Sequence, residues 1–142
     1  MMNDVLCVMY NVRCAVCIVL LLALSACWGK KDLPEDKAKA VLKEALSTLQ
    51  SGNVDGYMRY VDFGSEMDSV QLAVMQCLLK QHLDRQTQRK GTVVSIETVD
   101  AQLVGDSVCT VFCQLAFADS TVEVVSQKMV RVGETWKIRL RN

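Results

Sequence analysis

The sequence predicts a single α+β domain in which three N-terminal helices pack on a curved, four-stranded antiparallel meander. Apolar residues recur at intervals of three and four between residues 34 and 85, which is the helical period. After Gly91, β-branched residues dominate and short turn signals follow at regular spacing, which is typical of consecutive strands. A chain of 142 residues is long enough for one domain and not two, and we assign this domain to residues 34–142.

The first helix is expected from Pro34 to Gln50. Proline is tolerated in a first helical turn, and the acids that follow it favour the positive end of the helix dipole. Ser51-Gly52-Asn53 is a typical C-cap signal and ends the helix. The buried face of this helix is predicted to consist of the apolar residues at helical spacing: Ala38, Val41, Leu42, Ala45 and Leu49.

Two further helices are expected before the sheet. A short one runs from Val54 to about Tyr60, and a longer one opens at Ser65 and ends near Arg85. The basic end of the longer helix suits the negative end of the helix dipole, and an anion-binding patch there is the alternative. The longer helix is predicted to bury one apolar stripe, formed by Val70, Ala73, Val74, Cys77 and Leu78.

Four strands are expected, because turn signals at Gly105, Asp119 and Gly133 divide the rest of the chain. Strands joined by such short turns are antiparallel neighbours. The alternation of side chains predicts a sheet with one face against the helices and the other largely in water. The expected strands are 92–104, 107–118, 121–132 and 135–141.

Residues 1–26 are predicted to be a signal peptide. Arg13 precedes an uncharged run from Ala15 to Leu24, which has the length of a signal h-region, about 7–15 residues. A membrane-spanning helix needs about 20 apolar residues, so this run is too short to be one. The sequence leaves the start of translation open between Met1 and Met9.

The stretch Leu24-Ser25-Ala26-Cys27 resembles the lipobox of bacterial lipoproteins. The resemblance implies cleavage before Cys27, acylation of its sulfur, and a short tether over residues 27–33. Two or three acyl chains hold a protein firmly on a membrane. We therefore expect a palmitate-type lipid anchor in the bacterial cell envelope. The outer membrane, on its periplasmic side or its surface, is favoured because Trp28 replaces the aspartate that retains enterobacterial lipoproteins in the inner membrane.

The charge of the chain argues against nucleic-acid binding. It has 16 basic and 16 acidic residues, a net charge of zero, so no overall field attracts a polyanion.

Three cysteines lie within residues 34–142. Cys109 and Cys113 are four apart on one expected strand, which puts their Cα atoms about 13 Å apart. A disulfide requires less than about 7 Å, so these two do not pair with each other. Cys77 could pair with either of them, or all three could be small buried residues. No cysteine or histidine spacing indicates a metal site.

The helix Pro34–Gln50, the link Gly52 to Tyr57 and the ending Gly133-Glu134-Thr135-Trp136-Lys137-Ile138 resemble the nuclear transport factor 2-like (NTF2-like) superfamily. Within it, the chain is most similar to small bacterial lipoproteins of uncharacterised role. The resemblance covers about residues 34–141 and implies a sheet wrapped around a helix, with a cone-shaped cavity. The superfamily includes isomerases, dehydratases, binding proteins and adaptors, so the fold alone does not give the function.

Catalysis would require ionisable groups inside an apolar pocket. His82, the only histidine, is expected near the exposed end of the third helix. Tyr57 and Tyr60 with Asp62 could imitate an isomerase site, but the apolar strand faces supply no carboxylate. Serine-nucleophile, phosphate-loop and dinucleotide motifs are absent from the sequence. We expect no catalysis and no cofactor, and an isomerase- or dehydratase-like enzyme using the cone is the alternative.

A membrane-anchored, non-catalytic binding domain is therefore the predicted function. Its partner is either an apolar small molecule in the cone or an envelope protein on the outer face of the sheet, and the cavity volume would distinguish the two. The candidate partner face consists of Lys137, Arg139 and Arg141. The candidate cavity or rim residues are Tyr57, Tyr60, His82, Cys109, Val111, Cys113 and Trp136.

Overall fold

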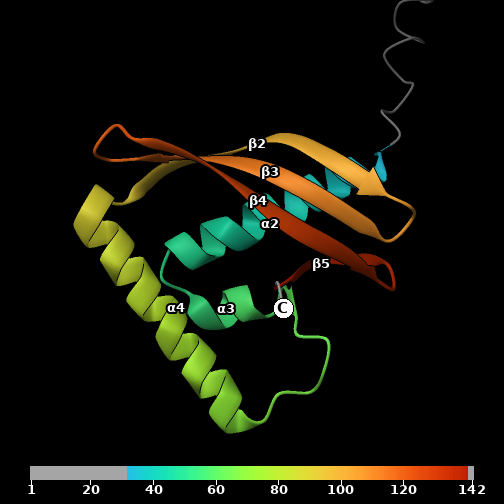
Figure 1. The fold of residues 1–142 in the computed structure, drawn as a ribbon, viewed down its shortest axis with the longest axis horizontal. Coiled ribbons are helices and arrows are strands. Elements are labelled where there is room, and N and C mark those ends of the chain that lie inside the picture. Colours follow the sequence, from blue (N-terminus) through green and yellow to red (C-terminus); the bar gives the residue numbers. More distant parts are fainter. Residues whose placement is uncertain (1–31, 141–142) are drawn as a thin grey trace, which may run out of the picture. The chain divides into compact units, whose positions relative to one another are not determined.

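Figure 1 shows the computed structural model of the protein, which describes residues 32–140. The expected signal peptide, most of the tether, the lipidation residue Cys27 and the partner-face residue Arg141 lie outside the described residues. The chain from Leu33 onward forms one compact unit, and among residues 32–140 the buried hydrophobic residues all lie between Ala38 and Ile138. This unit therefore has a core of its own and can fold without residues 1–31.

Helix α2 (Pro34–Gln50) has the predicted bounds, with its proline in the first turn. Ala38, Leu42, Ala45 and Leu49 are buried, and Val41 is half-buried against the same core. The predicted apolar face is thus confirmed. The chain turns at Gly52, whose φ of 85° is in the left-handed region that favours glycine.

Helix α3 (Val54–Met58) is shorter than expected and leads into a strand that was not predicted. The side chain of Asn53 caps α3 by accepting a hydrogen bond from the Gly56 N–H at 2.9 Å. The new strand β1 (Val61–Asp62) lies parallel to the last strand of the sheet. The Ile138 N–H donates to the Tyr60 carbonyl at 2.7 Å, which fixes this pairing.

The sheet has five strands in the order β1-β5-β4-β3-β2. The expected antiparallel meander of four strands is correct for β2 to β5, but β1 makes the complete sheet mixed. The bounds of the four strands agree with the prediction to within two residues. They are β2 (Val93–Val104), β3 (Val108–Phe117), β4 (Val122–Val132) and β5 (Thr135–Arg139).

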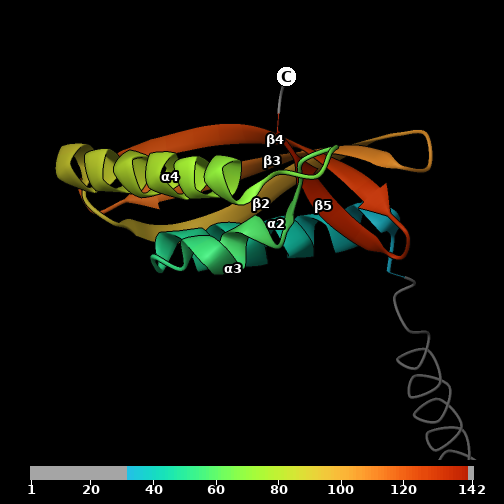
Figure 2. The same cartoon turned by 90° about the horizontal axis from the view of Figure 1, so that it is seen from below.

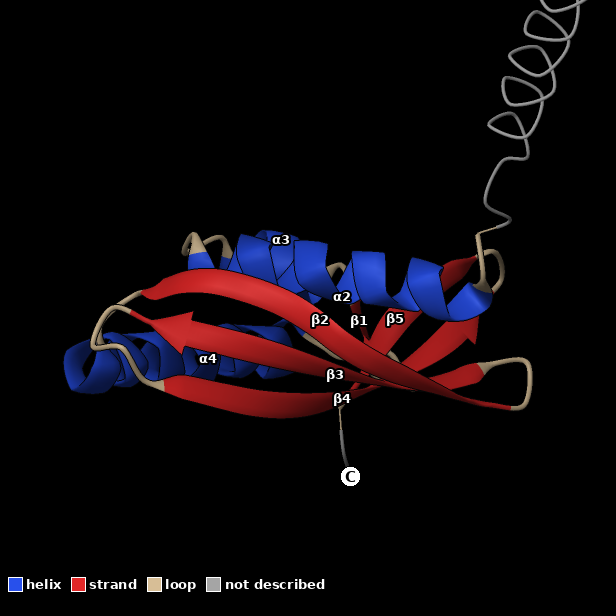
Figure 3. Ribbon diagram, turned by 90° about the horizontal axis from the view of Figure 1, so that it is seen from above, coloured by secondary structure: helices blue, strands red, loops and turns tan. Residues whose placement is uncertain are grey.

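The sheet bends around α2, which lies against one of its faces (Figure 3). The pairing of β2 with β3 shifts register near Val94 and near Val99, and each irregularity increases the local bend and twist. Leu42 of α2 and the β3 residues Cys109, Val111 and Cys113 are all fully buried between helix and sheet. The alternating face predicted for β3 is therefore the centre of the core.

Helix α4 (Ser69–Lys90) starts later and ends later than expected. Asp68, not Ser65, is its N-cap: the Asp68 carboxylate accepts from the Gln71 N–H at 2.8 Å, and the Gln71 side chain accepts from the Asp68 N–H. The helix ends at Gly91, which has a φ of 81°. Figure 2 shows α2 and α3 side by side, with α4 apart from α2.

The stripe that the sequence predicts as the buried face of α4 is exposed, so that prediction is wrong. Val70, Val74 and Leu78 are 69%, 53% and 55% exposed, and no residue of α4 is buried. The opposite side of the helix faces the domain. The side chains there are only half-buried, and the apolar ones are Leu72, Met75, Leu79 and Leu83.

The positions of Cys77, Cys109 and Cys113 decide between the two predicted alternatives, a disulfide or three small buried residues. Cys109 and Cys113 are buried and free, as expected for two residues that cannot reach each other. Cys77 is exposed and free, so the prediction that it pairs with a strand cysteine and the prediction that it is buried are both wrong. Among residues 32–140, no helix is long and apolar enough to cross a membrane.

Candidate ligand-binding cavity

A cavity lies beside α4, outside the packed space between α2 and the sheet. Its volume is about 750 Å³, within the range of about 300–1,000 Å³ that is typical of small-ligand sites. It forms where β4 continues beyond β5, because β5 pairs only with Met129 to Val132. This leaves the edge of β4 free up to Lys128. The lining residues are Asp62, Phe63, Gly64, Met75, Lys128, Arg139 and Leu140.

An ion pair fixes one wall of the cavity. The Arg139 guanidinium donates to the Asp62 carboxylate at 2.8 Å, across the parallel pairing of β1 with β5. The other oxygen of Asp62 accepts from the Gly64 N–H at 3.0 Å. The hydrogen bond from Arg139, and then the one from Gly64, hold the pKa of Asp62 below its usual value. Asp62 therefore stays ionised and is a weak base.

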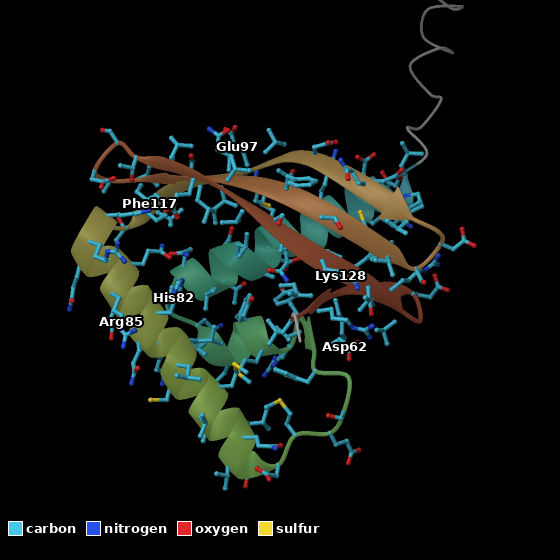
Figure 4. The ribbon with its side chains drawn as sticks, viewed as in Figure 1. Asp62, His82, Arg85, Glu97, Phe117 and Lys128 are labelled. Carbon is cyan, nitrogen blue, oxygen red and sulfur yellow. The ribbon has the colours of Figure 1, made fainter. Side chains whose placement is uncertain are left out.

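Lys128 places a second cation on the cavity. The ion pairs of the described residues involve Lys39, Lys90, Arg131 and Arg139 as their cations, and Lys128 is in none of them. Figure 4 shows Lys128 and Asp62 near the C-terminal end of the described chain. Because Asp62 offsets the charge of Arg139, the lining keeps one net positive charge.

The rest of the lining is apolar. Phe63 follows β1, Met75 belongs to the half-buried side of α4, and Leu140 follows β5. Phe63, Met75 and Leu140 all pack against the edge of the core. Methionine is flexible and polarisable, so Met75 can adapt to ligands of different shape. The cavity thus combines an adaptable apolar wall with one unpaired cation.

Five of the predicted cavity residues lie in the packed core. Tyr57 and Trp136 are 6% and 5% exposed, and the three β3 residues named above are fully buried. None of these five lines the cavity beside α4. Burial raises the pKa of Tyr57 and also those of the two strand thiols, so all three groups are neutral near pH 7. The centre of the space between α2 and the sheet is occupied by these side chains, and a cavity of about 350 Å³ lies at its edge between α2 and β2.

The other two predicted rim residues are separate from the cavity. Tyr60 is half-buried beside α2, and a hydrogen bond with Glu44 raises its pKa. His82 is exposed on α4 (Figure 4) and does not line the cavity. Of the predicted partner face, Lys137 is half-buried, while Arg139 is the cavity residue that binds Asp62.

Sequence reasoning missed most of the lining. Phe63 and Gly64 sit in a short connection, and Lys128 interrupts an apolar strand pattern without any motif around it. Met75 was placed outside the predicted buried stripe of its helix. Two lining residues did carry a signal: Asp62, which the sequence analysis considered only as a partner of tyrosine, and Arg139, which it assigned to the outer partner face.

The chemistry of the cavity favours binding over proton transfer. Asp62 is the only carboxylate of the lining, and its lowered pKa opposes a role as general base. Within residues 32–140, no cluster of three or more histidine, cysteine, aspartate or glutamate side chains is placed to hold a metal ion.

The comparisons with known proteins support the fold alone. No protein-family model and no curated protein matches the chain. Among solved structures, the chain is similar to a crystal structure from Campylobacter jejuni that bears the provisional name NTF2-like transpeptidase. The TM-score is 0.60 at 14% sequence identity, over 72% of this chain and 96% of that one. The domain therefore has the NTF2-like fold that the sequence resemblance implied.

Proposed function

We propose that this protein is a membrane-anchored lipoprotein of the bacterial cell envelope whose domain binds a small amphipathic acid without chemical conversion. The observation that supports binding most directly is the cavity beside α4, with its apolar wall and the unpaired Lys128. An apolar body would contact Phe63, Met75 and Leu140, and a carboxylate or phosphate would contact the Lys128 ammonium.

Two features favour this ligand class over a purely apolar molecule. The Arg139–Asp62 pair and Lys128 make part of the lining polar, and a purely apolar ligand would desolvate them without compensation. The charge of Lys128 then selects an anion over a cation. The core between α2 and the sheet is filled, so this site differs from the cone interior that the sequence resemblance implied.

The binding test uses residues 28–142 and a fluorescent fatty-acid probe, dansylaminoundecanoic acid. We expect saturable binding that is weaker for its uncharged methyl ester. Lys128→Gln should weaken binding of the acid by about fivefold, since an exposed charge pair contributes at most about 1 kcal/mol. It should leave binding of the ester unchanged. Lys37→Gln, on the exposed side of α2, is the matched control.

A second variant tests the position of the site. Met75→Trp adds volume to the cavity wall and should reduce binding of acid and ester alike. Binding that survives Met75→Trp unchanged would show that the probe sits elsewhere. Equal binding of acid and ester would contradict the role given to Lys128, and no binding of either would contradict the ligand class.

The anchor is tested on the full chain, expressed in a Gram-negative bacterial host. The sequence Leu24-Ser25-Ala26-Cys27 supports it, and the prediction is that the protein fractionates with membranes and carries the mass of acyl chains on Cys27. Cys27→Ser should release the protein into the soluble fraction. Membrane association that persists in Cys27→Ser, or a mature chain that begins at another residue, would refute lipidation.

A further inference from the structure

Helix α4 has an exposed apolar surface, which we call the outer stripe: Val70, Val74, Cys77 and Leu78. Helical geometry places these residues within about 60° of Val74 around the axis, so they form one continuous ridge. The ridge covers the first half of a helix that is about 33 Å long. Contiguous exposed apolar surface of this kind typically marks a site of interaction.

The domain itself leaves the outer stripe uncovered. All the described links from α4 to the domain use its other side: Gln76 bonds Asp55 of α3, Gln86 bonds Gln50 of α2, and Lys90 bonds Glu123 of β4. Turning the stripe inward would break all three links. The stripe is therefore held in solvent by the polar contacts behind it.

The charges around the outer stripe are self-complementary. Glu66 and Asp68 precede its N-terminal end. Beyond its C-terminal end, Arg85 and Arg89 lie on the same side of α4 as the stripe, with the exposed Asp84 beside them, and Figure 4 marks Arg85 on this helix. A surface that is acidic at one end and basic at the other matches a copy of itself turned end for end.

We propose that the outer stripe is a contact surface between two copies of this chain, with their α4 helices antiparallel. If the two-fold axis passes near Val74, Val70 of one copy lies opposite Leu78 of the other. The part of α4 around Arg85 then extends past Ser69, where the neighbour's α4 begins, toward the loop that carries Glu66 and Asp68. This arrangement buries the apolar ridge, pairs the opposite charges and opposes the two helix dipoles.

The size of the surface sets the strength of the contact. A stable interface commonly uses about 20–30 residues on each side, and the outer stripe with its flanking charges offers fewer. The dimer is therefore weak in solution, with a dissociation constant of about 10–100 μM. The inference does not depend on the ligand or on the lipid anchor.

The first test is sedimentation velocity of residues 28–142 between about 10 μM and about 1 mM. Wild type should shift from monomer to dimer across this range. Val74→Glu should weaken dimerisation at least about tenfold, because it places two carboxylates at the axis. Val94→Glu is the matched control, since Val94 is a similarly exposed valine on β2 (64% exposed) and should dimerise like wild type. Circular dichroism checks that both variants are folded.

The second test identifies the orientation. Arg85→Glu should weaken the dimer, Glu66→Arg should weaken it too, and the double variant should regain part of the loss because the charges are exchanged. A parallel arrangement would bring each residue beside its own copy and would give no such rescue.

Three outcomes would overturn the proposal. Wild type that stays monomeric at about 1 mM would show that the stripe does not bind a second copy and would leave a different protein as its occupant. A dimer that survives Val74→Glu would place the contact on another surface. Equal effects of Val74→Glu and Val94→Glu would show that charge alone, and not the stripe, controls association.

Discussion

The position of α4 can be tested by comparing two leucine truncations that remove the same atoms. Leu42→Ala acts at the centre of the core, where Leu42 is fully buried between α2 and the sheet. Leu78→Ala acts on the outer stripe of α4, where Leu78 is 55% exposed. The sequence prediction buries both leucines, whereas the structure buries only one.

The expected magnitudes differ several-fold. A fully buried leucine loses its transfer free energy and leaves a cavity, so Leu42→Ala should lower the free energy of unfolding by about 2–5 kcal/mol. Leu78 is more than half exposed and borders solvent, so its truncation leaves no closed cavity and should cost less than about 1 kcal/mol. For a domain of this size, the first change lowers the melting temperature by about 8–20 °C and the second by a few degrees.

The assay is urea unfolding of residues 28–142 followed by circular dichroism at 222 nm. Both variants are measured at a low and a high protein concentration, since stabilisation of a dimer depends on concentration and stabilisation of a monomer does not. Comparable m-values confirm that the same surface unfolds in each variant.

The reasoning fails if Leu78→Ala costs as much as Leu42→Ala at low concentration. That result would mean that the stripe is buried within one chain, as the periodicity first indicated. A cost for Leu78→Ala that grows with concentration would instead support the proposed contact between copies.

Further predictions concern single positions. Gly91→Ala should destabilise the domain by about 1–3 kcal/mol in urea unfolding, because Gly91 has a φ of 81° and an added Cβ would lie 2.8 Å from the Cβ of Ala118; an unchanged midpoint would contradict this. The pKa of Asp62 is lower in the folded chain than its value of 3.8 in the unfolded chain, so its ion pair with Arg139 stabilises the fold above pH 3.8. This stabilisation is lost as the pH falls through the folded-state pKa. The unfolding free energies of wild type and Asp62→Asn should thus differ by at most about 1 kcal/mol at pH 6 and converge near pH 2. A difference that persists at low pH would exclude the ion pair as the cause. The raised pKa of Tyr57 predicts the opposite sign: its neutral hydroxyl favours the fold below pH 10.0, and this preference is lost as the pH rises through the higher folded-state pKa. Tyr57→Phe should therefore make the domain less sensitive to alkaline unfolding, and an identical alkaline transition would refute the assignment.

The elements with strong local signals were predictable from the sequence. Helix α2 combines a proline start, an apolar face at one spacing and a Ser51-Gly52 end, and each signal agrees with the others. The strands β2 to β5 are separated by Gly105 and Gly133, which both have positive φ values in the structure. Strand β1 has only two residues, Val61 and Asp62, and its pairing with β5 depends on contacts distant in sequence. No local pattern could indicate it.

The cavity was less predictable for the same reason. Its lining comes from the connection after β1, the side of α4 that faces the domain, the free edge of β4 and the end of β5. Which residues meet there depends on how far β4 extends past β5 and on which side of α4 faces inward. The resemblance to the NTF2-like superfamily gave the fold correctly, but it directed attention to the interior between α2 and the sheet, where Trp136 and Val111 fill the space.

The error on α4 has an instructive physical cause. The helix carries two apolar stripes at helical spacing, one through Val74 and one through Leu79, and periodicity alone cannot choose between them. The sequence prediction buried the first. The second stripe contains Gln76, Gln86 and Lys90, each of which binds a polar partner on the domain.

Those polar partners decide the orientation because α4 has no fully buried residue to fix it. Leu79 and its neighbours are only partly buried, and the Val74 stripe could contribute a similar apolar area against the same elements. The distinguishing free energy is then that of three polar contacts, each of about 0.5–1.5 kcal/mol. Removing one, for example with Gln86→Leu, should loosen the C-terminal half of α4 and speed its amide hydrogen exchange, while Gln88→Leu on the exposed side should not. If Gln86→Leu instead slows the exchange, apolar contacts and not polar ones determine the orientation of α4.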